Sequence, residues 1–418
     1  MRPAPQARRP GAPRAAAVFM AFTAGLALAL APTAAARAGA FSGNLSGDLE
    51  LGLQGAAAAD AAGRDGLSGS LRLRWERRWG DFEAELHYLL SAPAGSAAGS
   101  GTVPGNPLAL SWTHVTAGGR RLEQRIDRLS IGWSRPGFVL RIGRQALTWG
   151  TGTVFHPMDI VSPSPPAATA TGNDFKPGTD MIYAQFLLRG GADLELVAVP
   201  RRIAPGGPVT AAASTFALRY RAQRGALDTE LVLARSRGEL IAGLGLSGAL
   251  GGAVWKLELV PVRLGDGRLR TSGLAGIGTG ATLVGRPAFL FAEFHRNGFG
   301  VAGGRAAPDA LPPELAERLA RGQVFTPARN SLALGATLSW SPLVELSAGT
   351  VLDLDARSGL ASLELGWSLS DNAELTLGAQ RSVGRCGSGI FGVPSASGAG
   401  TVCPAPAGGF YLRFRQHF

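Results

Sequence analysis

Apolar and polar residues alternate along most of the chain after residue 40. In the stretch 41–53 the apolar side chains occupy odd positions with polar ones between them; they are Phe41, Leu45, Leu49, Leu51 and Leu53. The same alternation returns in 67–76, where Leu71, Leu73 and Trp75 alternate with Arg72 and Arg74, and again in 82–90. A period of two places one face of a strand in an apolar environment and the other in water. The pattern therefore predicts β-strands with one apolar face each.

The same alternation of apolar and polar residues recurs to the end of the chain and predicts about 18 strands in all. Three cover 41–53, 67–76 and 82–90, and the others are expected near 125–134, 138–147, 181–189, 192–201, 214–222, 226–235, 240–248, 253–262, 273–283, 287–296, 331–340, 343–354, 360–368, 373–381 and 409–418. Very short turns, such as those at Gly80 and at Gly190 and Gly191, interleave with long links at 91–124, 148–180, 297–330 and 382–408. Short turns at one end and long loops at the other are typical of outer-membrane barrels. We therefore predict an all-β fold, an antiparallel transmembrane β-barrel of about 18 strands with long extracellular loops.

Composition supports a membrane barrel over other classes. Of the 418 residues 60 are glycine, 17% are charged and 45% are hydrophobic, which argues against disorder and against an ordinary enzyme with a charged surface. No stretch of about 18 apolar residues follows residue 40, so a transmembrane helix is not expected. Because lipid offers no hydrogen bonds to a sheet edge, such a sheet has to close on itself. At about 18 strands its interior is too wide for side chains to fill, which predicts a water-filled or loop-plugged lumen.

The first 40 residues differ from the rest of the chain. They contain five arginines and no acid, an apolar run over 15–31, and the small residues Ala38, Gly39 and Ala40. We interpret residues 1–40 as a secretory signal peptide, cleaved after Ala40 or Ala36, and residues 41–418 as the barrel. A retained membrane anchor is the alternative, but the apolar run is short for one. These arginines supply five of the net charge of +11, and the other basic residues are dispersed, so nucleic acid is not an expected partner.

The chain ends on a strand with aromatic side chains on one face. Phe410, Leu412, Phe414 and Phe418 share that face, and the chain stops at the last of them. This arrangement resembles the C-terminal signal by which the barrel assembly machinery recognises outer-membrane barrels. Tryptophans at strand ends are expected to form interfacial girdles; they are Trp75, Trp79, Trp133, Trp255, Trp340 and Trp367.

The side chains assigned to the lumen carry charges of both signs. The cations are Arg72, Arg74, Arg141, Arg189, Arg219, Arg221, Lys256, Arg413 and Arg415. The anions are Glu50, Glu83, Glu85, Asp193, Glu195, Asp228, Glu230, Glu258, Glu293 and Glu364. Neighbouring strands can pair them, so for any one of these residues a lattice of salt bridges is a better expectation than a dedicated ligand site.

One segment, 141–180, has an individual pattern. It begins as a strand and becomes a loop rich in glycine and proline, and its polar side chains could line a constriction or pin the loop to the wall. The pore candidates are Arg141, Arg144, Gln145, Trp149, His156, Asp159, Lys176 and Asp180. The pattern from Arg141 to Pro163 resembles bacterial outer-membrane porin-like barrels related in appearance to alginate-export barrels, whose folds have eighteen strands. That resemblance implies a channel, although the mixed lumen charges differ from the many cations with which alginate exporters line their pore.

Other chemistry is sparse. The five histidines show no metal-ligand spacing and no G-x-S-x-G elbow occurs, so neither a metal, a cofactor nor an enzymatic activity is expected. Cys386 and Cys403, both in the last long loop, are expected to form a disulfide in an oxidising compartment. A short helix is expected where Leu311, Leu315 and Leu319 repeat, ending near Gly322.

The sequence thus leads to two functional hypotheses for the bacterial outer membrane. The first is a channel for passive diffusion of small hydrophilic solutes, surrounded by outer-membrane lipid and narrowed by an inserted loop at 148–180. The second is a barrel that scaffolds or exports for an envelope partner complex, such as a polysaccharide secretion system or an electron-transfer assembly.

Overall fold

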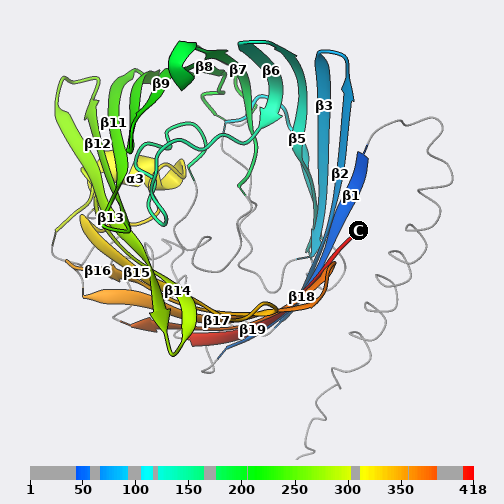
Figure 1. Cartoon of the computed structure of the whole chain (residues 1–418). Helices are drawn as coiled ribbons and strands as arrows, with labels where there is room; N and C mark the ends of the chain where they lie inside the picture. Colours follow the sequence, from blue (N-terminus) through cyan, green and yellow to red (C-terminus); the bar gives the residue numbers. More distant parts are fainter. Residues whose placement is uncertain are drawn as a thin grey trace, which may run out of the picture.

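The strands follow one another round a closed barrel in the computed structural model (Figure 1). The structure describes residues 44–56, 66–92, 105–115, 121–163, 176–204, 206–302, 311–355, 357–383 and 408–418. The expected signal peptide and both cysteines, Cys386 and Cys403, lie outside these ranges. No helix within them is both long and apolar enough to cross a membrane.

The sheet contains nineteen strands, of which eighteen form the ring. They are β1 (Asn44–Ala56), β2 (Gly66–Trp79), β3 (Phe82–Ala92), β4 (Ser111–Val115), β5 (Arg121–Arg135), β6 (Phe138–Gln145), β7 (Thr179–Leu187), β8 (Asp193–Val199), β9 (Thr215–Arg224), β10 (Leu227–Ser236), β11 (Glu239–Leu250), β12 (Ala253–Arg263), β13 (Leu269–Leu283), β14 (Arg286–Arg296), β15 (Asn330–Ser341), β16 (Val344–Asp353), β17 (Ser358–Ser370), β18 (Ala373–Val383) and β19 (Gly408–His417). Because β3 pairs directly with β5, the short β4 only extends the edge of β5 and does not belong to the ring. The predicted eighteen-stranded antiparallel barrel is confirmed.

The first and last strands close the barrel. β1 and β19 are antiparallel neighbours, with Leu51 opposite Phe414 and Leu53 opposite Leu412. At the very end Phe418 and Gly47 exchange two backbone hydrogen bonds of 3.0 and 2.9 Å. The C-terminal aromatic residue therefore lies in the seam of the barrel, where pairing of β1 with β19 removes the last free sheet edges.

The outer face of the barrel is apolar. On β10, Leu231 and Leu233 are 44% and 62% exposed, whereas Val232 between them is 2% exposed. Exposed and half-buried aromatic rings gather at the rim where the short turns lie; among them are Trp79, Phe82, Phe138, Phe186, Trp340 and Trp367. An apolar belt bounded by aromatic side chains is the outer surface of a membrane-embedded barrel.

The connections differ at the two rims. Two-residue turns such as Gly80 to Asp81, Pro136 to Gly137 and Asp371 to Asn372 lie at the rim where β1 begins and β19 ends. The longest connections, 93–110, 146–178, 297–329 and 384–407, join strand ends at the other rim. β14 begins at Arg286, one residue earlier than expected, because the turn before it lies at Val284 and Gly285. By the usual topology of outer-membrane barrels, the short turns face the periplasm.

Candidate functional site: the lumen and its inserted segment

β6 leaves the barrel wall early. It has 8 residues, whereas its neighbour β5 has 15. Gly143 near its end has φ +127°, and a Cβ there would lie 2.1 Å from the carbonyl oxygen of Leu129, so the backbone at this point requires glycine. Beyond Gln145 the chain turns inward, and residues 146–163, here called the inserted segment, lie inside the ring of strands (Figure 1).

The departure of β6 leaves a gap in the wall, which Arg144 and Asp180 fill. The Arg144 guanidinium donates to Asp180 Oδ1 at 2.6 Å, to the Ile126 carbonyl on β5 at 3.3 Å, and to the Leu108 carbonyl. The Leu108 N–H donates in turn to Asp180 Oδ2 at 2.8 Å. Both charged residues are at most 5% exposed. The structure therefore places them within the wall, on the face of the sheet opposite to the lumenal Arg141, and not along the pore as the sequence suggested.

The inserted segment packs its apolar side chains against one side of the lumen. Trp149, Met158 and Val161 are almost completely buried. Their partners are inward-facing residues of β7 to β12; these are Met181, Tyr183, Val197, Val199, Ala217, Val232, Ala234, Ile241, Val260 and Val262. Burial of each apolar side chain contributes about 1.5–3 kcal/mol relative to exposure. The segment is therefore held against this side of the lumen by hydrophobic packing.

Glu258 on β12 anchors the polar backbone of the segment. Its carboxylate accepts hydrogen bonds from the backbone N–H groups of Thr151, of Gly152 at 3.1 Å and of Met158 at 3.3 Å. An irregular loop cannot pair its own N–H groups, and unpaired buried groups are costly. The carboxylate thus supplies acceptors that the wall backbone, already paired within the sheet, cannot provide.

Glu293 on β14 does the same for the next residues. It accepts from the N–H groups of Thr153, of Val154 at 2.8 Å and of Phe155 at 3.3 Å. Successive N–H groups that converge on one carboxylate form an anion-binding concavity. Here the anion belongs to the barrel wall, so this concavity fixes the segment to the wall.

Trp149 is fixed by a third acid. Its indole N–H donates to Glu195 Oε2 at 2.8 Å, and the other oxygen of Glu195 accepts from Tyr183 at 2.9 Å and from Arg219 at 2.6 Å. The ring is therefore positioned by packing and by a charge-assisted hydrogen bond together.

Lys176 connects the two ends of the segment. Its ammonium donates to the Leu147 carbonyl at 2.6 Å, to Thr148 Oγ1 at 2.9 Å, and to the carboxylate of Asp159. Burial raises the pKa of Asp159 to about 7, although the charge of Lys176 acts in the opposite direction. Burial also lowers the pKa of Lys176 and of His156. The Asp159 carboxyl is thus a buried group that titrates close to neutral pH.

The loop after β14 covers the same side of the lumen from the long-loop rim. Its helix α3 (Pro313–Ala320) forms where the leucine repeat predicted one, and buries Leu315. Arg318 donates to both carboxylate oxygens of Glu239 at 2.7 Å, and its guanidinium lies 3.8 Å from the centre of the Phe299 ring. Between this loop and the inserted segment is a cavity of about 120 Å³, to whose lining His156 contributes.

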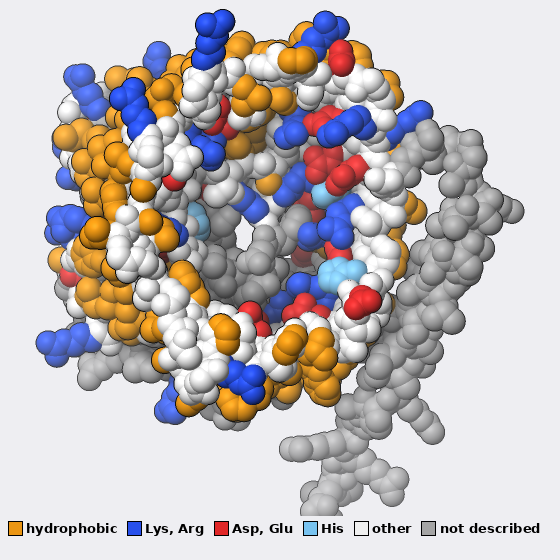
Figure 2. Space-filling model, in the orientation of Figure 1, with side chains coloured by type: hydrophobic (Ala, Val, Ile, Leu, Met, Phe, Trp, Pro, Cys, Tyr) orange, Lys and Arg blue, Asp and Glu red, His pale blue; other side chains and the backbone are white. Residues whose placement is uncertain are grey.

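The opposite wall of the lumen is charged. In Figure 2 acidic and basic side chains mingle on the inner surface over β2, β3 and β5. The pairs on this side are Arg74 with Asp48 at 3.1 Å, Arg141 with Glu83 at 2.7 Å, Arg415 with Glu50 at 3.0 Å and Arg413 with Glu364 at 3.8 Å. The expected lattice of cross-strand ion pairs is present, except that Arg189 lies in the turn between β7 and β8 and not on an inward strand position.

The pore candidates from the sequence therefore separate into three places. Arg141 lines the charged wall, while Trp149, His156, Asp159 and Lys176 belong to the inserted segment and its anchors. Gln145 ends β6, buried, with its amide 3.4 Å from the Met181 carbonyl. Arg144 and Asp180 are the wall residues described above.

Sequence reasoning missed the anchoring role of Glu195, Glu258 and Glu293, and of Glu230, which accepts a hydrogen bond from the Gly150 N–H at 3.2 Å. It had placed all four in the lumen only as lattice members. A signal was available for three of them, because Glu195, Glu230 and Glu258 share inward positions with valines and alanines on β8, β10 and β12.

Comparisons with known proteins identify the fold. No family model matches this sequence, and no curated protein sequence does either. Among solved structures, the chain is similar to OccAB3 of Acinetobacter baumannii, with a TM-score of 0.55 and 10% identity over 90% of this chain and 99% of that one. It is also similar to a BenF-like porin from Pseudomonas fluorescens Pf-5, with a TM-score of 0.53 and 9% identity over 90% and 99% of the two chains.

A third similar structure is Wzi of Escherichia coli, described as a carbohydrate-binding β-barrel involved in group 1 capsule assembly. Its TM-score is 0.52 at 10% identity, over 91% of this chain and 86% of that one. At such identities these likenesses establish a porin-like outer-membrane barrel fold.

Proposed function

We propose that this protein is an outer-membrane channel through which small hydrophilic solutes diffuse passively, and that the inserted segment sets the size limit. The observation that carries the proposal is the division of the lumen into two unlike halves. The apolar half over β7 to β12 is covered by the inserted segment, whereas the charged half over β1 to β5 is not lined by it. Water and solutes would pass along the charged half.

The charge pattern of that half suits small solutes of either sign. Arginines alternate with acids in cross-strand pairs, so the wall offers local dipoles and no continuous stripe of one charge. Fixed charges act strongly where a pore is narrow, because little water is available to screen them. We therefore infer weak charge selectivity and no stable binding of the solute. An enzymatic role is not proposed, and the porins among the similar structures agree with a transport role.

The alternative is a barrel that binds or exports for a partner complex. This alternative is supported by the similarity to Wzi, whose TM-score is close to those of the porin-like structures. The two hypotheses differ in one property, since a diffusion channel conducts ions by itself and a scaffold with a sealed lumen does not.

The test is a barrel with a shortened inserted segment, studied in planar bilayers. Residues between Thr153 and Lys176 would be replaced by a short Gly-Ser linker, and folding checked by heat-modifiable migration on a gel. We expect single-channel conductance to rise, and larger sugars to permeate in liposome-swelling assays. A barrel in which Glu364→Gln removes one lumenal charge remote from the segment is the control, and should retain the wild-type size limit.

Three results would count against the proposal. Unchanged conductance and sugar cut-off in a folded, shortened barrel would show that the segment does not limit the pore. A folded wild-type barrel that never conducts, together with a shortened form that never conducts, would favour the scaffold. A mature protein found soluble in the periplasm would exclude the membrane channel altogether.

A further inference from the structure

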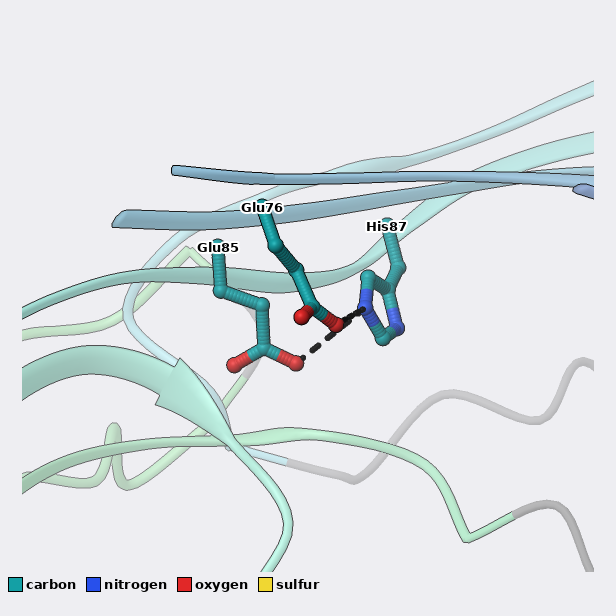
Figure 3. Close-up of side chains that lie close together, drawn as sticks. All are labelled: Glu76, Glu85 and His87. Atoms are coloured by element: carbon teal, nitrogen blue, oxygen red, sulfur yellow. Dashed lines mark ion pairs between the residues drawn. The ribbon is translucent and has the colours of Figure 1, made fainter. Parts of the chain in front are cut away.

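Three side chains that could bind a metal meet on the charged wall, near the short-turn rim. Glu76 is on β2, three residues before the strand ends, and Glu85 and His87 are near the start of β3 (Figure 3). Glu76 and Glu85 are direct cross-strand partners, and His87 is opposite Arg74. β2 and β3 are joined by the two-residue turn at Gly80 and Asp81, so one β-hairpin holds the three side chains in position.

The two carboxylates form an unusual pair in this lattice. Elsewhere on the charged wall, acidic side chains face basic side chains of the neighbouring strand. Here two acids are directly opposite each other, an arrangement that is destabilising because like charges repel. Of the guanidiniums around the pair, Arg74 is engaged with Asp48 at 3.1 Å and Arg141 with Glu83 at 2.7 Å. Arg128, opposite His87 on β5, donates to the carbonyls of Asp127 and Lys176. A cation between Glu76 and Glu85 would remove their repulsion.

His87 supplies a second, independent observation. Its side chain is 13% exposed, and Nε2 is shielded from solvent but makes no hydrogen bond. This nitrogen lies 3.2 Å from Glu85 Oε1 and 3.7 Å from Glu76 Oε1. An imidazole nitrogen that faces two carboxylate oxygens without a hydrogen bond is arranged as a ligand for an ion between them.

We propose that Glu76, Glu85 and His87 bind a divalent transition-metal ion, with Zn²⁺ as the best match. Their ligand atoms all lie within 4.8 Å of one another. Ligand atoms around a tetrahedral Zn²⁺ lie roughly 3.4 Å apart, given bond lengths of about 2.1 Å. The ligand atoms therefore need to move only slightly closer together, and the Glu76 side chain, which is 63% exposed, is free to move.

The donor set determines the class of metal. One imidazole nitrogen with two carboxylate oxygens suits Zn²⁺ and its neighbours among the first-row ions, whereas Ca²⁺ and Mg²⁺ prefer oxygen alone. Three protein ligands leave at least one position for water, which would face the lumen. The bound ion would add positive charge to the wall near the periplasmic mouth, so it would also disfavour cation passage there.

The test uses the full-length folded barrel in detergent micelles, purified without a histidine tag and treated with EDTA. Titration calorimetry with ZnCl₂ should show one ion bound per chain, and Co²⁺ should give the visible absorption of a low-coordinate site. Glu76→Gln and His87→Ala should each weaken binding at least 10-fold, with heat-modifiable migration retained. Glu76→Gln is the safer variant for folding because that side chain is exposed. His114→Ala, on the exposed β4, is the matched control and should bind as the wild type does.

The result does not depend on channel activity. Wild-type binding that His87→Ala and Glu76→Gln leave unchanged would overturn the proposal, and so would the absence of Zn²⁺ binding at millimolar concentration. Either outcome would leave the proposed diffusion channel unaffected.

Discussion

Replacing Glu293 by alanine should release the inserted segment from the wall. The change removes the carboxylate that accepts the N–H groups of Thr153, Val154 and Phe155. A hydrogen bond to a charged group contributes about 1.5–3 kcal/mol, and this contribution falls to about 1 kcal/mol where lumen water replaces part of the lost acceptor. With about 1 kcal/mol for each of the three N–H donors, the docked segment loses about 3 kcal/mol of stabilising free energy. Since about 1.4 kcal/mol is a factor of ten, the equilibrium between docked and released segment should shift roughly 100-fold towards release.

Planar-bilayer recording can measure this shift. In Glu293→Ala we expect frequent transitions to a higher-conductance level that the wild type visits rarely. Glu293→Gln, which keeps one carbonyl oxygen as acceptor, should have an intermediate effect. Glu364→Ala removes the same charge from the lumen but contacts Tyr411 and not the segment, so it should alter ion selectivity without new conductance levels. Equal behaviour of the Glu293 and Glu364 variants would refute the view that the carboxylate holds the segment.

Two further changes test the anchor and the exit of β6. The pKa of Asp159 is raised from 3.8 to about 7 when the segment is docked, so docking takes up a proton between these pH values and acid favours it. Current fluctuations should therefore be greater at pH 8 than at pH 6, and Asp159→Asn should abolish the difference. Gly143→Ala should cost at least about 1–3 kcal/mol of stability, because of its positive φ and the nearby Leu129 carbonyl. Urea unfolding in lipid vesicles measures this cost, with Gly280→Ala, which would contact nothing, as control and no difference between the two as the contrary result.

The strands of this protein could be predicted because lipid imposes a strict rule on them. Every residue that faces lipid must be apolar, so the period of two is preserved over strand after strand, as in Leu231 and Leu233 around Val232. The rule says nothing about where a strand leaves the wall. Thus β6 was expected to reach residue 147 but ends at Gln145, and the short β4, which extends the edge of β5, was not predicted.

The site was less predictable, because a polar residue has the same appearance in a sequence whether it faces water or fills a gap. Arg144 and Asp180 are as polar as Arg141, yet they substitute for missing backbone pairing between β5 and β7. Glu258 is one of many lumenal acids, and only the fold reveals that its partners are backbone N–H groups of a segment about 100 residues away in sequence.

The inward positions of the strands nevertheless distinguish the two halves of the lumen. On β2 the inward residues include Arg72, Arg74 and Glu76, which face water or charged side chains of the neighbouring strands. On β12 the inward Val260 and Val262 lie between outward apolar residues, so both faces of the strand are apolar there. Contact between apolar side chains and pore water is unfavourable. A barrel strand with two apolar faces therefore implies that another segment covers its inner side. The inserted segment is that cover, and the strands without such valines mark where the water-filled path can run.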